Sequence, residues 1–529
     1  MATLASLRTR RSAAQRQALT MVEREIRASD HNGRRKYLRE FCQAFLSYES
    51  VLDAHRVWEL VRDADLVLIA DYHALPSSQR FAGSLLEQRA LAGDRPVVLG
   101  VETVFSRDQH ILDEWWRREI DGEELRERMR FQSDWGYQWE PFYDLLRTAR
   151  EHGEAIYGLD CMPREDLRKI AVRDRHAAEK LVEIRERHPQ AAVLVLFGES
   201  HLAPQHLPHA VRQRLPLSRM LTVLQNVDAL YWQAAGEERE RVEAVRVSED
   251  VICVFNATPL EKYEQYRLCL DAWAREDAPD LAPTIYNLID SLVRFLGFRH
   301  YSSHNSSQPR FLIDLLPEVH CRPSDATLRK LMARSGICDA DAEAIQLRIE
   351  ERGCLYLPAV NAFCIREFQV VYAAEEATRF LHHACRGLPE DTLARPLLPR
   401  AGANLFYIRA LEHALAYFGS RVLNPARPAV RSDEGGAWSR AGCEKQLENV
   451  ARTQSNFSAA TEVLGYMMGS HLYDAYLHGH VNRGQLRRLF LAHLQKPGVA
   501  REIWWRLIAE TPPSRCSRKA WAPVAFPLS

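Results

Sequence analysis

The feature of this sequence that most restricts its fold is a series of short apolar runs between residues 60 and 260. The runs are rich in β-branched residues, and segments with helical periodicity separate them. Their length and composition predict buried strands rather than helices. The predicted strands are Asp65–Ala70, Pro96–Glu102, Ala155–Asp160, Ala192–Glu199, Arg219–Gln225 and Val251–Ala257. This alternation of strand and helix predicts an α/β fold, with a mostly parallel sheet covered by helices on both faces.

The pattern changes near residue 300, where amphipathic helical stretches replace the strand and helix alternation. A chain of 529 residues also exceeds what one hydrophobic core usually supports. We therefore predict an N-terminal helical extension (1–54), an α/β domain (55–298) and a mainly α-helical second domain (299–529). The sequence does not indicate what the second domain does.

Composition excludes several classes of function. Lys plus Arg and Asp plus Glu both total 70, so net charge favours neither nucleic acid nor an anionic membrane as a partner. No apolar run approaches the length of a membrane span, and neither a P-loop nor a Gly-x-Gly-x-x-Gly motif follows a strand. The eleven cysteines are scattered without a Cys-x-x-Cys pair, and the N-terminus lacks the apolar segment of a secretory signal. We predict a cytoplasmic protein, and the sequence leaves a homo-oligomer open.

Titratable side chains follow four of the predicted strands. They occur in Asp71-Tyr72-His73, Glu102, Asp160 and Glu199-Ser200-His201. A single acid after a strand is more often the N-cap of the next helix, and Asp160 fits that use best. Because the carboxyl ends of parallel strands meet at one crevice, the joint pattern instead favours a ligand-binding or catalytic site there.

Four segments in this region resemble, in order, the ChaN-like haem-binding uptake family, which is grouped with the Tiki peptidases and the erythromycin esterases. They are "VLIADYHALPSSQRFAGSLLEQR", "VVLGVETVFSRDQHILDEWWRREIDGEELRERM", "WEPFYDLLRTAREHGEAIYGLDCMPRE" and "FGESHLAPQHLPHAV". The resemblance covers about residues 55–260, under half of the chain. The family begins its pattern with Gly-Glu-x-His, whereas this sequence has Ala70-Asp71-Tyr72-His73 and so carries a shorter carboxylate.

The resemblance implies two kinds of ligand for the crevice. For a divalent metal ion, we predict His73, His201 and Glu102 as ligands, with Asp71 beside them. Glu102 and Glu199 are the candidate catalytic carboxylates, Glu102 as a general base, and Asp71 and Glu199 are expected to orient the imidazole rings.

For haem, the expected axial atom comes from Tyr72, His73 or His201. Aromatic residues are then expected to face the macrocycle, and they are Phe105, Trp135, Trp139, Phe142 and Tyr143.

The leading functional prediction is therefore binding of haem or another iron-bearing or metal-bearing small molecule in the strand-end crevice. One alternative is a metal-dependent hydrolase of the peptidase or esterase type that uses the same histidines and glutamate. A second alternative is a non-catalytic interaction scaffold with a degenerate site. Whether the chain is an enzyme stays open at this point.

Two motifs in the second domain concern its packing and its histidines. In "FLHHACRG", His382 and His383 are adjacent, and neighbouring residues on a helix point about a third of a turn apart, so we expect no joint chelation. In "VLGYMMGSHL", Gly465 and Gly469 are four residues apart, which suits close contact between two helices.

Overall fold

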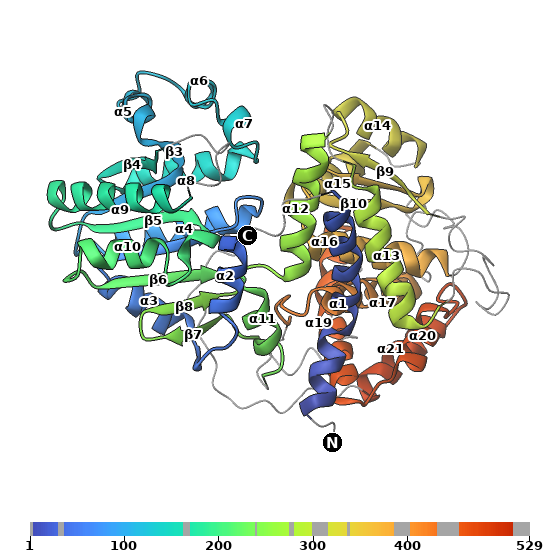
Figure 1. Cartoon of the computed structure of the whole chain (residues 1–529). Helices are drawn as coiled ribbons and strands as arrows, with labels where there is room; N and C mark the ends of the chain where they lie inside the picture. Colours follow the sequence, from blue (N-terminus) through green and yellow to red (C-terminus); the bar gives the residue numbers. More distant parts are fainter. Residues whose placement is uncertain are drawn as a thin grey trace. The chain divides into compact units, whose positions relative to one another are not determined.

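The computed structural model describes residues 4–29, 36–161, 170–237, 241–274, 280–298, 316–335, 339–385, 402–430 and 454–510. The chain forms two compact units (Figure 1). Arg24–Glu276 makes up the first, which we call the sheet unit. Met1–Glu23 joins Asp277–Lys519 in the second, which we call the helical unit.

These units divide the chain at other positions than the predicted boundaries, which stay a prediction. Helix α1 (Leu4–Ser29) begins in the helical unit. There the Asn287 side chain of α13 (Ala282–Leu296) donates a hydrogen bond to the carbonyl of Ala18, at 3.1 Å. The N-terminal helix thus packs on a helix that follows it by more than 250 residues.

The sheet unit contains an eight-stranded sheet in the order β1-β7-β8-β6-β2-β5-β3-β4. The six strands from β8 to β4 are parallel, while β7 pairs antiparallel with β8 and β1 pairs antiparallel with β7. The strands are β1 (Ser50–Leu52), β2 (Leu66–Asp71), β3 (Val97–Phe105), β4 (Ala155–Asp160), β5 (Ala192–Gly198), β6 (Met220–Gln225), β7 (Ala244–Ser248) and β8 (Val251–Val254). This confirms the predicted α/β class with its mostly parallel sheet.

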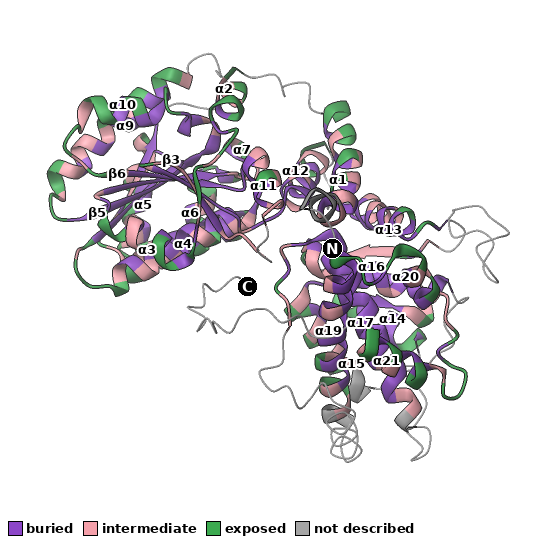
Figure 2. Cartoon of the chain, turned by 90° about the horizontal axis from the view of Figure 1, so that it is seen from below, coloured by how far each residue is buried: buried purple, intermediate pink, exposed green. Residues whose placement is uncertain are grey.

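Both faces of the sheet are buried, which explains why its strands read as continuous apolar runs. In β2, Val67 and Ile69 enter one hydrophobic core and Leu66, Leu68 and Ala70 enter the other. Side chains alternate between the faces of a strand, so each face contributes to a separate core. In Figure 2 the strands are buried between helices whose outer faces are exposed.

The helices of the sheet unit connect successive strands. They are α2 (Lys36–Ala44), α3 (Ala54–Asp63), α4 (Pro76–Leu91), α5 (Gln109–Trp116), α6 (Gly122–Arg128), α7 (Phe131–Asp134), α8 (Trp139–His152), α9 (Ile170–Arg187), α10 (Leu207–Arg214), α11 (Asp228–Ala234) and α12 (Pro259–Ala274). Short 3₁₀ turns lie at Ser106–Asp108 (η1) and Glu199–Leu202 (η3). The two antiparallel strands at the β1 side of the sheet, β1 and β7, were not predicted.

The helical unit also contains a small sheet that the sequence did not indicate. Its order is β10-β11-β9, with strands β9 (Glu318–Cys321), β10 (Cys354–Leu357) and β11 (Ala362–Ile365). The remaining helices are α14 (Asp325–Arg334), α15 (Asp339–Arg352), α16 (Val370–Ala384), α17 (Gly402–Leu423), α19 (Gln454–His478), α20 (Arg483–Phe490) and α21 (Val499–Glu510).

Helices α17 and α19 pack closely, as the glycine spacing predicted. A Cβ atom on Gly465 would lie 2.6 Å from the Ala410 carbonyl oxygen, and one on Gly469 would lie 2.6 Å from the Ala414 carbonyl oxygen. The two glycines therefore allow backbone to approach backbone. Within the residues that the structure describes, no helix combines the length and the apolarity needed to cross a membrane.

Candidate functional site

The carboxyl end of β2 carries a histidine that an aspartate holds in place. Asp71 is the last residue of β2, and its Oδ2 lies 2.6 Å from Nδ1 of His73. The amide of Gln79, in α4, donates to the other oxygen of the same carboxylate. With Nδ1–H donated to Asp71, Nε2 is the nitrogen of His73 that can accept a proton. Asp71 thus orients this ring, as predicted.

Glu102 lies inside β3 rather than beyond its end, because the strand continues to Phe105. The register between β3 and β4 shifts between Val101 and Phe105, and irregularities of this kind redirect a side chain relative to the sheet. Oε1 of Glu102 accepts a hydrogen bond from Nη2 of Arg173 at 2.6 Å, and Oε2 accepts one from the Gly198 N–H. The carboxylate is therefore fixed at both oxygens.

His201 lies in η3, directly after β5, and an aspartate also holds its ring. Its Nδ1 is 2.5 Å from Oδ1 of Asp174 in α9, and the Tyr37 hydroxyl donates to the other Asp174 oxygen at 2.9 Å. The sequence predicted that Asp71 and Glu199 orient the imidazole rings. In the structure, Asp174 rather than Glu199 holds the ring of His201.

The two histidines face the same carboxylate. Nε2 of His73 lies 3.6 Å from Oε2 of Glu102, and Nε2 of His201 lies 3.8 Å from Oε1. His73 is the most accessible of the three, with 10% of its side chain exposed. A Cβ on Gly198 would lie 2.9 Å from Oε2 of Glu102 and 3.3 Å from Nε2 of His73. The glycine at the end of β5 therefore keeps the space beside both groups open.

Arg173 and Asp174, both in α9, complete this arrangement, and neither was predicted from the sequence. Arg173 bonds to Glu102 and also to Asp160, at 2.8 Å from Nε to Oδ1 and 2.7 Å from Nη2 to Oδ2. The helix follows β4, so its first turns start at the edge where the strands end. That position was the available signal, although "KIAVRDRHAAEK" has the composition of an ordinary solvated helix.

Asp160 anchors Arg173 and accepts a hydrogen bond from the N–H of Cys161 at 2.9 Å. The helix start that it was expected to cap, near residue 164, lies outside the described residues. Burial raises the pKa of Asp160 despite the hydrogen bonds and charge of Arg173.

Charge in the site holds Glu102 ionised. Burial by itself would raise the pKa of Glu102, but Arg173, His73, His201 and the Gly198 N–H outweigh it and lower that pKa to about 2. A permanently charged carboxylate thus sits between the two imidazoles.

Glu199 belongs to a different pair. Both of its oxygens contact Nζ of Lys262, at 3.1 and 3.0 Å, and the ammonium lies 4.4 Å from the ring centroid of Tyr72. Burial raises the pKa of Glu199, while the charge of Glu199 raises that of Lys262 against the effect of burial. This pair joins η3 to α12. Glu199 is directed toward Lys262 rather than toward His73 or His201.

The predicted haem ligands differ in what surrounds them. Burial raises the pKa of the Tyr72 phenol well above 10, which opposes its use as a phenolate ligand. Nε2 of His73 faces Glu102 at 3.6 Å, and a Cβ on Gly198 would lie 3.3 Å from it, so both groups crowd the nitrogen that would bind haem iron. Tyr143 packs against Trp115 and Trp139, with ring centroids 5.9 and 5.5 Å away. Haem ligation by these side chains stays a prediction that the described geometry does not favour.

An aromatic wall borders His73, in partial agreement with the expectation. Trp135, Tyr137 and Phe142 lie 5.5, 5.3 and 6.3 Å from it between ring centroids. Trp135 and Phe142 were predicted, and Tyr137 was not.

The predicted metal ligands do not form a compact ligand group. Among the described residues, the one group of three whose ligand atoms all lie within 4.8 Å of one another is His382, His383 and Glu412, in the helical unit. Arg173 also places a positive charge on Glu102, which opposes a second cation there. The geometry of the strand-end site therefore does not support the divalent metal.

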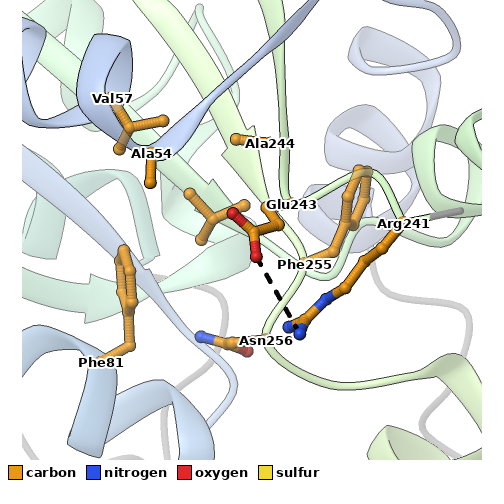
Figure 3. A pocket seen from close by; sticks show the side chains of 9 residues that line it. Ala54, Val57, Phe81, Arg241, Glu243, Ala244, Phe255 and Asn256 are labelled. Carbon is orange, nitrogen blue, oxygen red and sulfur yellow. Dashed lines mark ion pairs between the residues drawn. The ribbon is translucent and has the colours of Figure 1, made fainter. Parts of the chain in front are cut away.

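A small apolar pocket lies elsewhere in the sheet unit (Figure 3). It holds about 50 Å³ and is lined by Ala54, Val57, Phe81, Arg241, Glu243, Ala244, Val254, Phe255 and Asn256. Arg241 and Glu243 form an ion pair of 4.0 Å at its side. This volume admits a few waters, whereas pockets for small organic ligands usually span several hundred Å³.

Comparisons with known proteins concern the N-terminal part of the chain. The structure of ChaN from Campylobacter jejuni with cofacial haem binding aligns with 12% identity and a TM-score of 0.26, over 33% of this chain and 86% of that one. The type III effector HopBA1 aligns with 14% identity and a TM-score of 0.27, over 40% of this chain and 96% of that one. No curated protein matches the sequence.

A family model supplies the remaining comparison. It is described as haem-binding uptake, Tiki superfamily, ChaN, and it matches residues 57–172. These residues include β2, β3 and β4 and, with them, Asp71, His73 and Glu102. The predicted resemblance is confirmed over this range: residues 57–172 of the sheet unit match the ChaN haem-binding uptake family of the Tiki superfamily.

Proposed function

We propose that the sheet unit is a hydrolase that uses acid–base catalysis by His73, His201 and Glu102. One observation carries this proposal: two imidazoles, each held by an aspartate at Nδ1, direct Nε2 to opposite oxygens of one carboxylate. Imidazole is the side chain most often used for general acid and base catalysis, and orienting it in this way suits that use. The ChaN-like family is grouped with peptidases and esterases, which suggests an ester or amide as the substrate.

Each group has a role in this proposal. His73, the more exposed imidazole, takes a proton from a water molecule, and Asp71 stabilises the imidazolium that forms. The hydroxide attacks the substrate carbonyl. His201, which starts the step as the imidazolium, gives its proton to the leaving oxygen or nitrogen, so that hydrolysis yields one acid and one alcohol or amine. Proton exchange through solvent then returns the proton from His73 to His201. Glu102, fixed by Arg173, holds the water between the two rings.

This proposal differs from the predicted metal-dependent hydrolase in one respect. In place of a metal ion, the Arg173 guanidinium and the Gly198 N–H bind the Glu102 carboxylate as hydrogen-bond donors. Proton transfer by the histidines then supplies the activation of water that a metal would otherwise provide.

The test is hydrolysis of chromogenic esters and of short fluorogenic peptides by the full chain. The variants are His73→Ala, His201→Ala and Glu102→Gln. Loss of a general acid or base typically lowers rates by about 10²- to 10⁴-fold. We expect losses in that range for each variant, with an unchanged circular dichroism spectrum.

His188→Gln is the matched control, because His188 is also held by a carboxylate, Glu154 at 2.7 Å, but bonds to Tyr157 instead of Glu102. It should retain full activity. Equal activity of all four variants, or no turnover of any ester or peptide, would contradict the proposal.

Binding of a haem-type ligand is the second candidate, and the family match over residues 57–172 favours it. We propose that such a ligand packs beside His73 on Tyr137, the half-buried ring of this aromatic wall, whose other members, Trp135 and Phe142, are buried.

Titration of the purified chain with haem, followed by absorbance, tests this candidate. A saturable Soret band that Trp135→Ala and Tyr137→Ala weaken would support it. A band that persists in both variants, or no saturable band, would reject binding at this wall. Hydrolysis is measured on the same preparations, so the two candidates are judged separately.

A further inference from the structure

We propose that the helical unit contains a binding site for a divalent transition-metal ion, formed by His382, His383 and Glu412. The two histidines lie near the end of α16, and Glu412 lies in the neighbouring helix α17. One ligand atom from each of the three side chains lies within 4.8 Å of the other two. Two imidazoles and one carboxylate form a ligand set that suits zinc and related metals.

One of the three distances between ligand atoms is close to that of a zinc site, and the other two are no more than 4.8 Å. Nε2 of His383 and Oε1 of Glu412 are 3.8 Å apart. Ligand atoms at 2.0–2.1 Å from a tetrahedral zinc ion lie roughly 3.4 Å from one another. Bringing this pair together requires a shift of about 0.4 Å, which a change in side-chain torsion supplies.

Burial distinguishes this group from an ordinary surface cluster. His382 is 1% exposed and Glu412 is 6% exposed, while the side chain of His383 is 12% exposed. Buried polar side chains are costly to keep in an apolar surrounding. A bound cation offsets that cost for all three ligands together.

The rings are held by aromatic neighbours before any metal binds. His382 makes an edge contact with Phe490 at 5.9 Å, and His383 lies 6.0 Å from Tyr356, measured between ring centroids. Side chains that are already positioned lose less conformational entropy on binding.

The sequence alone predicted that His382 and His383 do not chelate together, because adjacent helical residues diverge. The divergence stands, with the two ring centroids 6.1 Å apart. Glu412 changes the outcome, because it enters from a second helix and completes a group of three. A contact between helices separated by a long segment is not visible in a sequence pattern.

Arg409 competes with a metal ion for the carboxylate. Its Nη1 contacts Oε2 of Glu412 at 2.9 Å, while Oε1 is the oxygen that faces His383. One oxygen therefore serves the arginine and the other serves the metal. Arg409 lowers the net attraction for a cation, so we expect affinity in the micromolar range rather than that of a structural zinc site.

The experiment is titration of the chelator-treated full chain with Zn²⁺ by calorimetry, and with Co²⁺ by visible absorbance. We expect one site, a cobalt d–d band, and a rise in the thermal midpoint on adding zinc. His383→Gln and Glu412→Gln should each weaken zinc binding by about 100-fold or more and abolish the cobalt band.

Arg409→Gln is the matched control, because it breaks the same ion pair as Glu412→Gln but leaves all three ligands. It should keep or increase the affinity for zinc. Glu102→Gln, in the sheet unit, and His480→Gln, at an exposed histidine, should leave binding unchanged. The proposal fails if zinc does not bind, or if Glu412→Gln binds zinc as well as the unaltered chain does.

Discussion

Each unit of this protein buries a carboxylate among charged side chains, and the partners differ. In the sheet unit, Glu102 contacts one arginine, Arg173, and faces two imidazoles. In the helical unit, Glu375 contacts Arg427 at 2.8 Å and Arg379 at 2.9 Å and accepts a hydrogen bond of 2.6 Å from Tyr466. Guanidinium groups keep their proton at all ordinary pH values, whereas imidazoles exchange it near neutrality.

The contrast separates a structural network from a site with chemical capacity. Charge from Arg427, Arg379 and Arg352 lowers the pKa of Glu375 far below its ordinary range, although burial opposes this. The network therefore keeps Glu375 ionised. Its imidazole, His413, lies 2.9 Å from Nη2 of Arg379, and burial lowers the pKa of His413, so the network stabilises the packing of helices. The network around Glu102 contains two groups that can transfer protons, and it leaves space beside them at Gly198.

The largest expected effect comes from Glu375→Gln. Removing one member of a buried ion network leaves guanidinium charges without compensation, which typically costs about 3–5 kcal/mol of unfolding free energy. Denaturant unfolding, followed by circular dichroism, measures it. Hydrolysis by the sheet unit should be unchanged under native conditions.

Glu462→Gln is the control for this prediction. Glu462 pairs with Arg348 and Arg352 but is 18% exposed, so solvent screens the pair and the loss should stay below about 1 kcal/mol. Equal losses in the two variants would remove the distinction between the buried and the exposed part of the network.

Gly198→Ala tests whether the space beside Glu102 matters. The φ angle of Gly198 is −52°, which any residue adopts, so the substitution adds no backbone strain. Its methyl group would instead press on Glu102 and His73. We expect kcat/KM for ester hydrolysis to fall roughly 10- to 100-fold, which corresponds to about 1.4–2.7 kcal/mol.

Gly83→Ala is the matched substitution in the same unit. A Cβ there would have its nearest neighbours at 3.9 Å, an ordinary contact, and the position lies within α4. It should leave kcat/KM unchanged and, because alanine favours helix, slightly raise stability. If both glycine variants keep full activity, the open space at Gly198 has no role in catalysis.

The sequence predicted the parallel sheet because burial on both faces imposes a local pattern, an apolar run in each strand. It likewise predicted His73, Glu102 and His201, since residues that follow parallel strands must converge. It did not predict Arg173 or Asp174, because both lie in a helix whose charged composition is typical of a solvated surface. Their role depends on where the first turns of α9 lie, which is a property of the tertiary fold.

Two other differences between prediction and structure have the same origin. The antiparallel strands β1 and β7 carry a weaker apolar signal because they are short and only partly buried. The pairing of Glu199 with Lys262 joins residues 63 positions apart. Interactions that are local in sequence could be predicted, and those that depend on distant packing could not.

A third carboxylate, that of Glu261, makes the stability of the sheet unit depend on pH. Burial raises the pKa of Glu261 to about 7, against the opposing effects of the hydrogen bond with Thr258 and of the charge of Arg80. The folded state therefore binds more protons than the unfolded state between about pH 4.5 and 7, and stability falls as the pH rises through this window. The variant Glu261→Gln cannot ionise at this position, so it should not lose stability as the pH rises.

We expect Glu261→Gln to stabilise the sheet unit by roughly 1–2 kcal/mol at pH 8, since one pKa unit corresponds to about 1.4 kcal/mol. At pH 4 the variant and the unaltered chain should unfold at the same temperature. Thermal melts at both pH values measure the difference, and a gain of equal size at pH 4 would show that the charge is not its cause.

The smallest expected effect tests how far the oriented histidine depends on groups behind it. The Tyr37 hydroxyl bonds to Asp174, which in turn holds His201, and the Tyr37 ring stacks on His206 at 3.6 Å between centroids. Tyr37→Phe keeps the stacking and removes one hydrogen bond, worth about 0.5–1.5 kcal/mol. We expect kcat to fall about 2- to 10-fold, KM to stay the same, and the pH profile of kcat to shift, because Asp174 becomes a freer acceptor for His201.

Tyr157→Phe removes a hydroxyl bonded to His188, outside the site, and should change none of these quantities. If the two tyrosine variants behave alike, Asp174 orients His201 without help from Tyr37, and the histidine depends on a single carboxylate as His73 depends on Asp71.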